Sequence, residues 1–224
     1  MTTLLIATRN LHKVGEIHEI LGSQFQFLTL NDFPKAPKIV EDANTFDGNA
    51  AKKAGALADW LAQIQNSEFR IQNGFVLADD SGLEVDALNG APGVHSARFA
   101  AMDSAGTENS SSAENNAKLL RLLKNVPTEK RTARFHCVIA LAAFNSKFEI
   151  RNSKLFDGVC EGRIVLEPCG QSGFGYDPLF VPDGFEQTFA ELGEAVKNKL
   201  SHRAKALKKL KNFLNSKDAK TQSV

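Results

Sequence analysis

Two adjacent acidic residues follow a short apolar segment and could bind a cation. Asp79 and Asp80 come directly after Phe75–Ala78, a segment whose composition predicts a buried strand. Neighbouring carboxylates repel each other, so the pair favours a position at which a metal ion or a basic side chain compensates the charge. Mg²⁺ binds carboxylate oxygens together with substrate phosphate oxygens. Taken alone, however, Asp79–Gly82 is favourable turn chemistry, and the local pattern favours a turn.

A second polar segment, Thr8–Lys13, combines hydroxyl, amide and ammonium groups. It lies between Thr3–Thr8, which we expect to be a strand, and a helix that Asn10 could cap. The N-terminus of a helix presents backbone N–H groups and a positive dipole end, which suits a phosphate chain. The GxxxxGK[ST] motif of Walker loops is not present. On its own the segment favours a loop that caps a helix.

A glycine-flanked aromatic segment, Gly173-Phe174-Gly175-Tyr176-Asp177-Pro178, could bind a flat ligand. Glycines let a backbone approach a ligand closely. Phe174 could stack on a base, and Asp177 could accept hydrogen bonds from ring or amino N–H groups. A tight loop that carries a core phenylalanine is an equally good interpretation.

A fourth feature is the order of residues at Ser201-His202-Arg203. Ser201 can cap a helix, and two basic residues then fall in its first turn, where each opposes the helix dipole by ~0.3–1 kcal/mol. Such a local misfit favours a ligand-facing role for His202 and Arg203. The alternative is a pair of solvated side chains.

The elements that position these residues alternate early and cluster as strands later. This order predicts an α/β or mixed α+β fold, with helices on a sheet. A capping box at Ser111-x-x-Glu114 marks one further helix start. We expect helices and strands at these ranges: strands over Thr3–Thr8, Phe25–Leu30, Phe75–Ala78, Ala133–Phe144, Phe148–Phe156 and Arg163–Glu167, and helices after Asn10, over Phe46–Gln65, after Ser111 and after Ser201.

Composition limits the class of protein. The chain has 224 residues, 42% hydrophobic and 24% charged, with a formal net charge of +1, as in an ordinary globular protein. No apolar stretch is long enough to span a membrane, and three scattered cysteines favour a reducing cytosol. Residues 196–224 carry nine basic residues and one acid. We interpret this excess as a solvated last helix with a flexible basic and polar tail over 216–224, rather than a nucleic-acid patch.

Taken together, these segments resemble the noncanonical purine nucleoside triphosphate pyrophosphatases, the inosine triphosphate pyrophosphatase family. The resemblance spans residues 4 to about 210. The residues that carry it are Ala7-Thr8-x-Asn10-x-x-Lys13-x-x-Glu16-Ile17, Thr45-Phe46-x-x-Asn49-Ala50-x-x-Lys53-Ala54, Asp79-Asp80-Ser81-Gly82-Leu83-x-Val85-x-Ala87-Leu88-x-Gly90-x-Pro92-Gly93, Ser96-Ala97-Arg98, Gly173-Phe174-Gly175-Tyr176-Asp177-Pro178-x-Phe180 and Ser201-His202-Arg203.

The resemblance implies a single two-lobed domain over residues 1–215, a long central mixed sheet flanked by helices, and an active site in the cleft between lobes. It also implies a homodimer. From the composition and charge we expect a cytoplasmic protein with no membrane span and no stable nucleic-acid partner. The implied reaction is Mg²⁺-dependent hydrolysis of ITP, dITP or XTP to the monophosphate and pyrophosphate. Asp80 would be the catalytic carboxylate, acting as general base or metal ligand, and Glu41 would be the second metal carboxylate, although Asp42 and Asp79 remain alternatives to Glu41. The implied substrate-binding residues are Thr8, Arg9, Asn10, Leu11, His12, Lys13, Ser81, Phe174, Gly175, Tyr176, Asp177, Lys197, His202 and Arg203.

Two other functions stay open at this point. A pyrophosphatase of the Maf-like type would act on modified pyrimidine or methylated nucleotides instead. A nucleotide- or RNA-binding protein without turnover would explain the basic C-terminal segment, but it has no use for the acidic pair Asp79 and Asp80.

Overall fold

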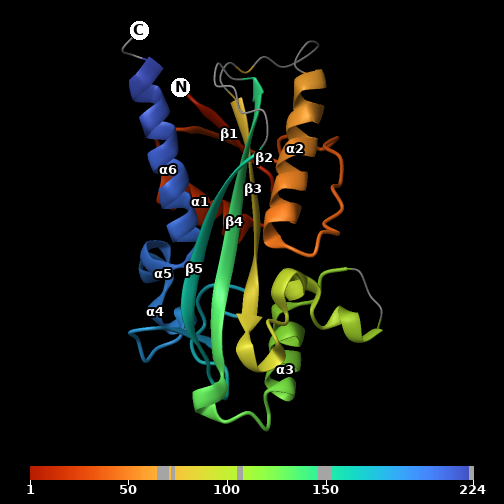
Figure 1. Cartoon of the computed structure of the whole chain (residues 1–224), viewed down its shortest axis with the longest axis vertical. Helices are drawn as coiled ribbons and strands as arrows, with labels where there is room; N and C mark the ends of the chain where they lie inside the picture. The colour runs from red at the N-terminus through yellow and green to blue at the C-terminus, as the bar shows by residue number, and fades with distance from the viewer. Residues whose placement is uncertain (65–70, 72–73, 105–107, 146–152, 222–224) are drawn as a thin grey trace. The chain divides into compact units, whose positions relative to one another are not determined.

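The computed structural model describes residues 1–64, 71, 74–104, 108–145 and 153–221. Six strands form one mixed sheet in the hydrogen-bonded order β2-β1-β3-β4-β5-β6 (Figure 1). β1 pairs in parallel with both β2 and β3, whereas β5 and β6 are antiparallel. The expected mixed α/β class is therefore confirmed. The strands are β1 (Thr3–Ile6), β2 (Gln26–Thr29), β3 (Gly74–Val85), β4 (Thr132–Asn145), β5 (Lys154–Ile164) and β6 (Phe180–Pro182).

Helices connect and cover these strands. Short 3-10 turns occupy 86–88, 93–98, 101–104 and 128–130. The α-helices are α1 (Leu11–Leu21), α2 (Phe46–Ile64), α3 (Ser112–Leu122), α4 (Phe189–Leu192), α5 (Glu194–Leu200) and α6 (His202–Thr221). No helix in the described part of the chain is both long and apolar enough to cross a membrane.

The expected helix starts are confirmed at the level of individual hydrogen bonds. The Asn10 side chain accepts from the backbone N–H groups of His12 and Lys13, so α1 begins there. Ser111 and Glu114 form the complete capping box of α3. Ser201 Oγ accepts from the backbone N–H of Ala204 at 3.2 Å and caps α6.

The chain divides into two compact units. The first comprises Met1–Asp80, Val138–Asp157 and Lys205–Val224. Its core is apolar, since Leu4 and Leu5 of β1, Ile17 of α1, and Leu57 of α2 are almost completely buried. In this unit α1 and α6 lie on one side of the strands and α2 lies on the other (Figure 1).

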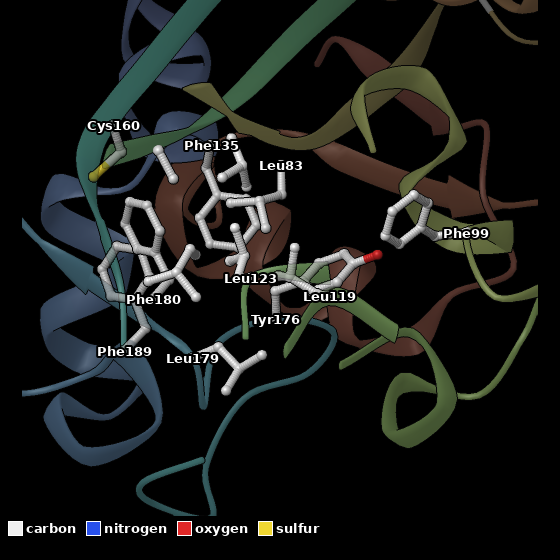
Figure 2. Packing of buried hydrophobic residues seen from close by; sticks show 13 residues of the cluster. Leu83, Phe99, Leu119, Leu123, Phe135, Cys160, Tyr176, Leu179, Phe180 and Phe189 are labelled. Atoms are coloured by element: carbon white, nitrogen blue, oxygen red, sulfur yellow. The ribbon is translucent and has the colours of Figure 1, made fainter. Parts of the chain in front are cut away.

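The second unit comprises Ser81–Cys137 and Gly158–Ala204. A cluster of thirteen buried residues forms its core (Figure 2). Strands β3 to β6, helices α3 and α4, and the segment around Tyr176 all contribute to this core. Its members are Leu83, Val85, Phe99, Leu119, Leu123, Ala133, Phe135, Cys160, Ile164, Tyr176, Leu179, Phe180 and Phe189.

Three expected elements differ in the structure. Asp79–Gly82 lies within β3 and is not a turn. One continuous strand, β5, replaces the two separate strands expected over Phe148–Phe156 and Arg163–Glu167, although residues 148–152 lie outside the described residues. Helix α6 runs to Thr221, so residues 216–221 continue the helix where an irregular tail is expected. Whether the segment over 216–224 is dispensable stays a prediction.

Candidate functional site

The polar segment before α1 is organised by its own side chains. Thr8 Oγ1 accepts from the backbone N–H of Asn10 at 3.1 Å, and Asn10 caps α1. Arg9, Leu11 and His12 are exposed; Leu11, an apolar side chain, is 70% exposed. The first turn of α1 contains no acidic residue, so its positive dipole end is not neutralised locally. The structure thus presents an ordered, electropositive loop at the C-terminal end of β1.

Beside this loop the first unit gathers two lysines and three carboxylates. We call Lys13, Glu41, Lys53, Asp79 and Asp80 the acid–lysine cluster. Lys13 forms an ion pair with the fully buried carboxylate of Asp79, and Lys53 forms one with Glu41. Lys53 Nζ also donates to the backbone carbonyl of Asp79 at 3.1 Å. The two lysines therefore compensate the charges of Asp79 and Glu41.

Asp80 itself is compensated incompletely. It is 7% exposed, and its Oδ2 atom accepts no hydrogen bond from any described residue. Burial raises the pKa of the Asp80 carboxyl to about 6, because a low-dielectric environment disfavours the charged form. The cations of Lys13 and Lys53 and the Asn49 side chain oppose that increase in pKa.

The surroundings of Asp80 also distinguish among the carboxylates that could share a metal ion with it. The negative charge of Glu41 contributes to the raised pKa of Asp80, so Glu41 is close. Asp79 is engaged by Lys13, and Asp42 pairs with Lys52 at 2.6 Å in a largely exposed bridge. The described residues contain no group of three or more His, Cys, Asp or Glu side chains that could hold a metal ion. An oxygen donor set of one or two carboxylates completed by substrate suits Mg²⁺, and the unpaired Oδ2 of Asp80 fits that donor set.

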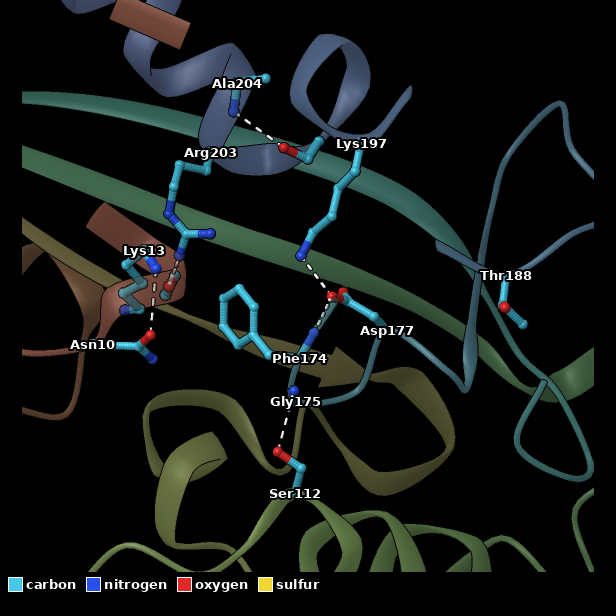
Figure 3. Close-up of polar contacts among 12 residues, drawn as sticks. Asn10, Lys13, Ser112, Phe174, Gly175, Asp177, Thr188, Lys197, Arg203 and Ala204 are labelled. Atoms are coloured by element: carbon cyan, nitrogen blue, oxygen red, sulfur yellow. Dashed lines mark hydrogen bonds and ion pairs between the residues drawn. The ribbon is translucent and has the colours of Figure 1, made fainter. Parts of the chain in front are cut away.

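The second unit holds a different arrangement around an aromatic ring. We call Ser81, Phe174, Asp177, Lys197 and Arg203 the Phe174 cluster. Lys197 Nζ lies 2.6 Å from Asp177 Oδ2, and both side chains are almost completely buried. Asp177 also accepts from the Phe174 backbone N–H at 2.8 Å (Figure 3). Lys197 Nζ lies 4.4 Å from the centroid of the Phe174 ring.

Arg203 completes this cluster from the first turn of α6. It is 1% exposed, and its Nη2 donates to Ser81 Oγ at 2.9 Å. His202 is also buried, and its ring stacks on Phe135 with centroids 4.8 Å apart. The interpretation of these two residues as solvated side chains is therefore wrong. Both polar side chains are buried, and the buried guanidinium of Arg203 needs an electron-rich partner.

The side chain of Tyr176 belongs to the core of the second unit. It is 4% exposed, and its hydroxyl donates to the backbone carbonyl of Ser96 at 2.9 Å. Burial raises the pKa of this phenol well above its ordinary value. The Tyr176 hydroxyl therefore bonds to Ser96 within the core, whereas Asp177 pairs with Lys197 beside the Phe174 ring.

Two residues of the first unit stand next to the candidate site although the residue types alone did not select them. Lys53 contacts Glu41 and Asp79, and Asn49 is 1% exposed beside Asp80. Asn49 Oδ1 accepts from the Ala43 backbone N–H at 2.9 Å, which links it to the segment that carries Glu41. Both residues lie on α2, four positions apart and hence on one helix face, and that spacing was the available signal.

The mixed sheet carries a carboxylate flanked by lysines in the first unit and an aromatic ring flanked by cations in the second, groups that can bind phosphate-borne cations and stack on a flat ring. Residues 4–213 match the sequence profile of the Ham1 family, and the chain belongs to that family. It is 47% identical over 213 residues to a dITP/XTP pyrophosphatase of Desulforamulus reducens, covering 95% of each chain.

Solved structures agree with that assignment. The Ham1 protein of Staphylococcus aureus is 34% identical, with a TM-score of 0.77, and the match covers 96% of this chain and 100% of that one. The HAM1 protein of Coxiella burnetii is 37% identical, with a TM-score of 0.76 and the same coverage. The fold of the whole chain is therefore that of the family.

Proposed function

We propose that this protein hydrolyses the deaminated purine nucleoside triphosphates ITP, dITP and XTP to their monophosphates and pyrophosphate. Relatives that align over nearly their whole length are named dITP/XTP pyrophosphatases. The observation that carries the proposal is Asp80, a buried carboxylate with an unpaired oxygen between two lysines. Such a group is what a reaction of polyanionic phosphates needs, because those phosphates bring metal ions with them.

In the proposed reaction a water molecule attacks the α-phosphorus, and the bond from that phosphorus to the oxygen bridging it to the β-phosphate breaks. Asp80 would accept a proton from the water, and a pKa of about 6 leaves it ionised at neutral pH yet basic enough for that task. Asp80 and Glu41 would hold Mg²⁺. When bound, the ion would supply charge neutralisation on the phosphate oxygens and orientation of the water.

The triphosphate is assigned to the electropositive loop Thr8–Lys13, with Lys13 as its cation and the α1 N-terminus as its dipole. Lys13 is paired with Asp79 in this structure, so substrate phosphates would share or replace that partner. Ser81, which follows Asp80 in the chain, would contribute a further phosphate contact. Arg9, Leu11 and His12 are exposed, and we assign them to the rim of the loop.

The base is assigned to the Phe174 cluster. Phe174 would stack on the purine ring, and His202 and Arg203 would supply donors toward a 6-oxo group. An adenine would place an amino group against those donors and leave them unpaired, at ~1–3 kcal/mol each. Lys197 and Asp177 hold the Phe174 backbone, and Gly175 lets that backbone turn. Tyr176 would support this loop from the core rather than contact the nucleotide with its hydroxyl.

The remaining parts of the proposal concern the assembly and the compartment. We assign the protein to the cytoplasm, as a homodimer without a stable nucleic-acid partner, on the strength of the family it belongs to. Sedimentation equilibrium at micromolar concentration tests the dimer, because a species of 24.4 kDa would be the monomer.

The decisive experiment measures pyrophosphate release from ITP, dITP, XTP, GTP and ATP, with Mg²⁺ and with EDTA. We expect Mg²⁺-dependent release from the first three, lost in Asp80→Asn. The matched control is Asp42→Asn, since Asp42 lies in an exposed pair with Lys52 and should be dispensable. Faster hydrolysis of dTTP or UTP than of ITP would instead favour the Maf-like activity. Salt-sensitive RNA binding without turnover, unchanged in Asp80→Asn, would favour the binding protein.

A further inference from the structure

Helix α3 contacts the loop that carries Phe174 through two side chains. Ser112 Oγ accepts from the backbone N–H of Gly175 at 3.2 Å (Figure 3). Asn116 Nδ2 donates to the backbone carbonyl of the same glycine at 3.1 Å. Ser112 and Asn116 are four positions apart, so they lie on one face of α3, one turn from each other. Both polar groups of a single peptide residue are therefore held by one helix face.

The contact between α3 and Gly175 lies next to Phe174, the residue proposed to bind the base. Gly175 directly follows Phe174, whose own N–H is held by Asp177. Side-chain packing does not restrain this position: the φ of Gly175 is +64°, and a Cβ there would meet no described atom within 4 Å. The two bonds from α3 thus fix the backbone on one side of Phe174, and Asp177 fixes it on the other.

Asn116 differs from its neighbour Asn115 in a way that suggests more than structural support. Asn115 uses both ends of its amide, accepting from Ala100 N at 2.8 Å and donating to Ala97 O at 3.2 Å. Asn116 is 9% exposed, and its Oδ1 has no hydrogen-bond partner in the described part of the chain. A buried acceptor without a donor costs stability. Asn116 is therefore a poor choice for stability alone, and its one bond, to Gly175, is the benefit that it provides.

We propose that Asn116, together with Ser112, is a positioning residue for nucleotide binding: the pair holds Gly175 so that Phe174 keeps its place against Lys197. The inference rests on the proposed function, because it takes Phe174 as the residue that binds the base. It predicts that α3 sets the affinity for the nucleotide and leaves the hydrolytic step at Asp80 untouched.

The test compares Asn116→Leu, Ser112→Ala and the matched control Asn115→Leu. Leucine keeps approximately the volume of asparagine but can neither donate nor accept a hydrogen bond. We expect Asn116→Leu to raise the KM for ITP roughly three- to tenfold, as one lost hydrogen bond would, with kcat unchanged within about twofold. Ser112→Ala should act in the same direction, and the double variant should show less than the product of the two effects, since both act through Gly175.

Asn115→Leu loses two structural bonds and should lower the urea midpoint of unfolding without changing KM. A second readout needs no activity: hydrogen exchange at the Gly175 amide should accelerate in Ser112→Ala and Asn116→Leu and not in Asn115→Leu. Unchanged KM and unchanged exchange in folded Asn116→Leu would overturn the inference. So would an equal rise of KM in Asn115→Leu, because the effect would then be general destabilisation.

Failure of the proposed function has a different signature. In that case the wild-type protein would release no pyrophosphate from any of the nucleotides, whatever happens at residue 116. The exchange measurement still decides whether α3 holds Gly175. If hydrogen exchange at the Gly175 amide is as slow in Ser112→Ala and Asn116→Leu as in the wild-type protein, the positioning role is refuted independently of the substrate.

Discussion

Replacing Asp80 by asparagine should stabilise the protein at neutral pH while it removes the proposed activity. The pKa of Asp80 is about 6 in the folded chain, above the ordinary 3.8, because burial disfavours its charged form. A carboxyl whose folded pKa is raised contributes stability that is fully present below the unfolded pKa and is lost as pH rises through the folded pKa. The difference between the two pKa values corresponds to ~3 kcal/mol lost once the pH is well above 6. Asparagine carries no such charge.

The assay is urea unfolding in EDTA, since a bound metal ion would offset the cost of the buried charge. The stability of Asp80→Asn relative to wild type should be about 2 kcal/mol more favourable near pH 8 than near pH 4.5. Packing differences between the side chains do not depend on pH and cancel in this comparison. In Asp42→Asn the pH dependence should be small and of opposite sign, because Lys52 lowers the pKa of the exposed Asp42. Equal differences for Asp80→Asn at both pH values would refute the reasoning.

The remaining predictions concern the ion pair of the second unit, the end of α6 and the metal ion. Lys197→Met should cost ~3–5 kcal/mol in urea unfolding, because it leaves the buried Asp177 carboxylate uncompensated; recovery in the double variant with Asp177→Leu would confirm that cause, and a neutral single variant would contradict it. A truncation after Asn215 should leave kcat and KM for ITP unchanged, and a loss of activity would show that the end of α6 is needed. Chelation with EDTA should abolish pyrophosphate release, and titration with Mg²⁺ should restore it; full activity in EDTA would remove the metal from the mechanism.

The helix starts could be predicted from the sequence because the interactions that fix them are local. Asn10 bonds to residues two and three positions further on, and Ser111 pairs with Glu114. Residue types and short spacings contain all of that information. The same holds for two short strands with apolar centres, Thr3–Ile6, which is buried, and Gln26–Thr29, which is partly exposed.

The ends of the long strands could not be predicted from the sequence, because pairing with other strands overrides the local conformational preference of the residues. Asp79–Gly82 has turn chemistry, yet this segment continues β3 beyond its pairing with β1, in a strand that also neighbours β4, and three of its four residues are buried. Gly162 lies within β5 where a Cβ would fall 2.3 Å from the Val181 carbonyl oxygen. It permits the close approach of β6, with which it is in register, and does not mark a break.

The candidate site was predicted as a set of segments, but not as a set of contacts. Lys13 and Asp79 are 66 positions apart, and Ser81 and Arg203 are 122 apart, so no local pattern pairs them. The structure also gives different partners to Glu41 and Asp42, which are adjacent in the chain: Asp42 pairs with Lys52, whereas Glu41 pairs with Lys53 and its charge acts on Asp80. Which partner each of two adjacent side chains contacts depends on the tertiary structure, and their positions in the sequence do not reveal it.

The acid–lysine cluster and the Phe174 cluster differ in how completely their buried carboxylates are compensated, and this difference is consistent with different roles. Lys197 and Asp177 form a buried ion pair, and Asp177 also accepts from the Phe174 backbone N–H, so each charge of that pair has a partner of opposite sign. Asp80 has one oxygen without a hydrogen bond from any described residue, and its pKa is raised in spite of the charges of Lys13 and Lys53. A carboxylate that already pairs with a cation has little to gain from a further ligand. An incompletely compensated carboxylate is stabilised when a cation or a polarised water binds to it. Functional sites are where such stability is given up. This difference supports the proposal that Asp80, and not the more deeply buried ion pair, is the centre of the chemistry.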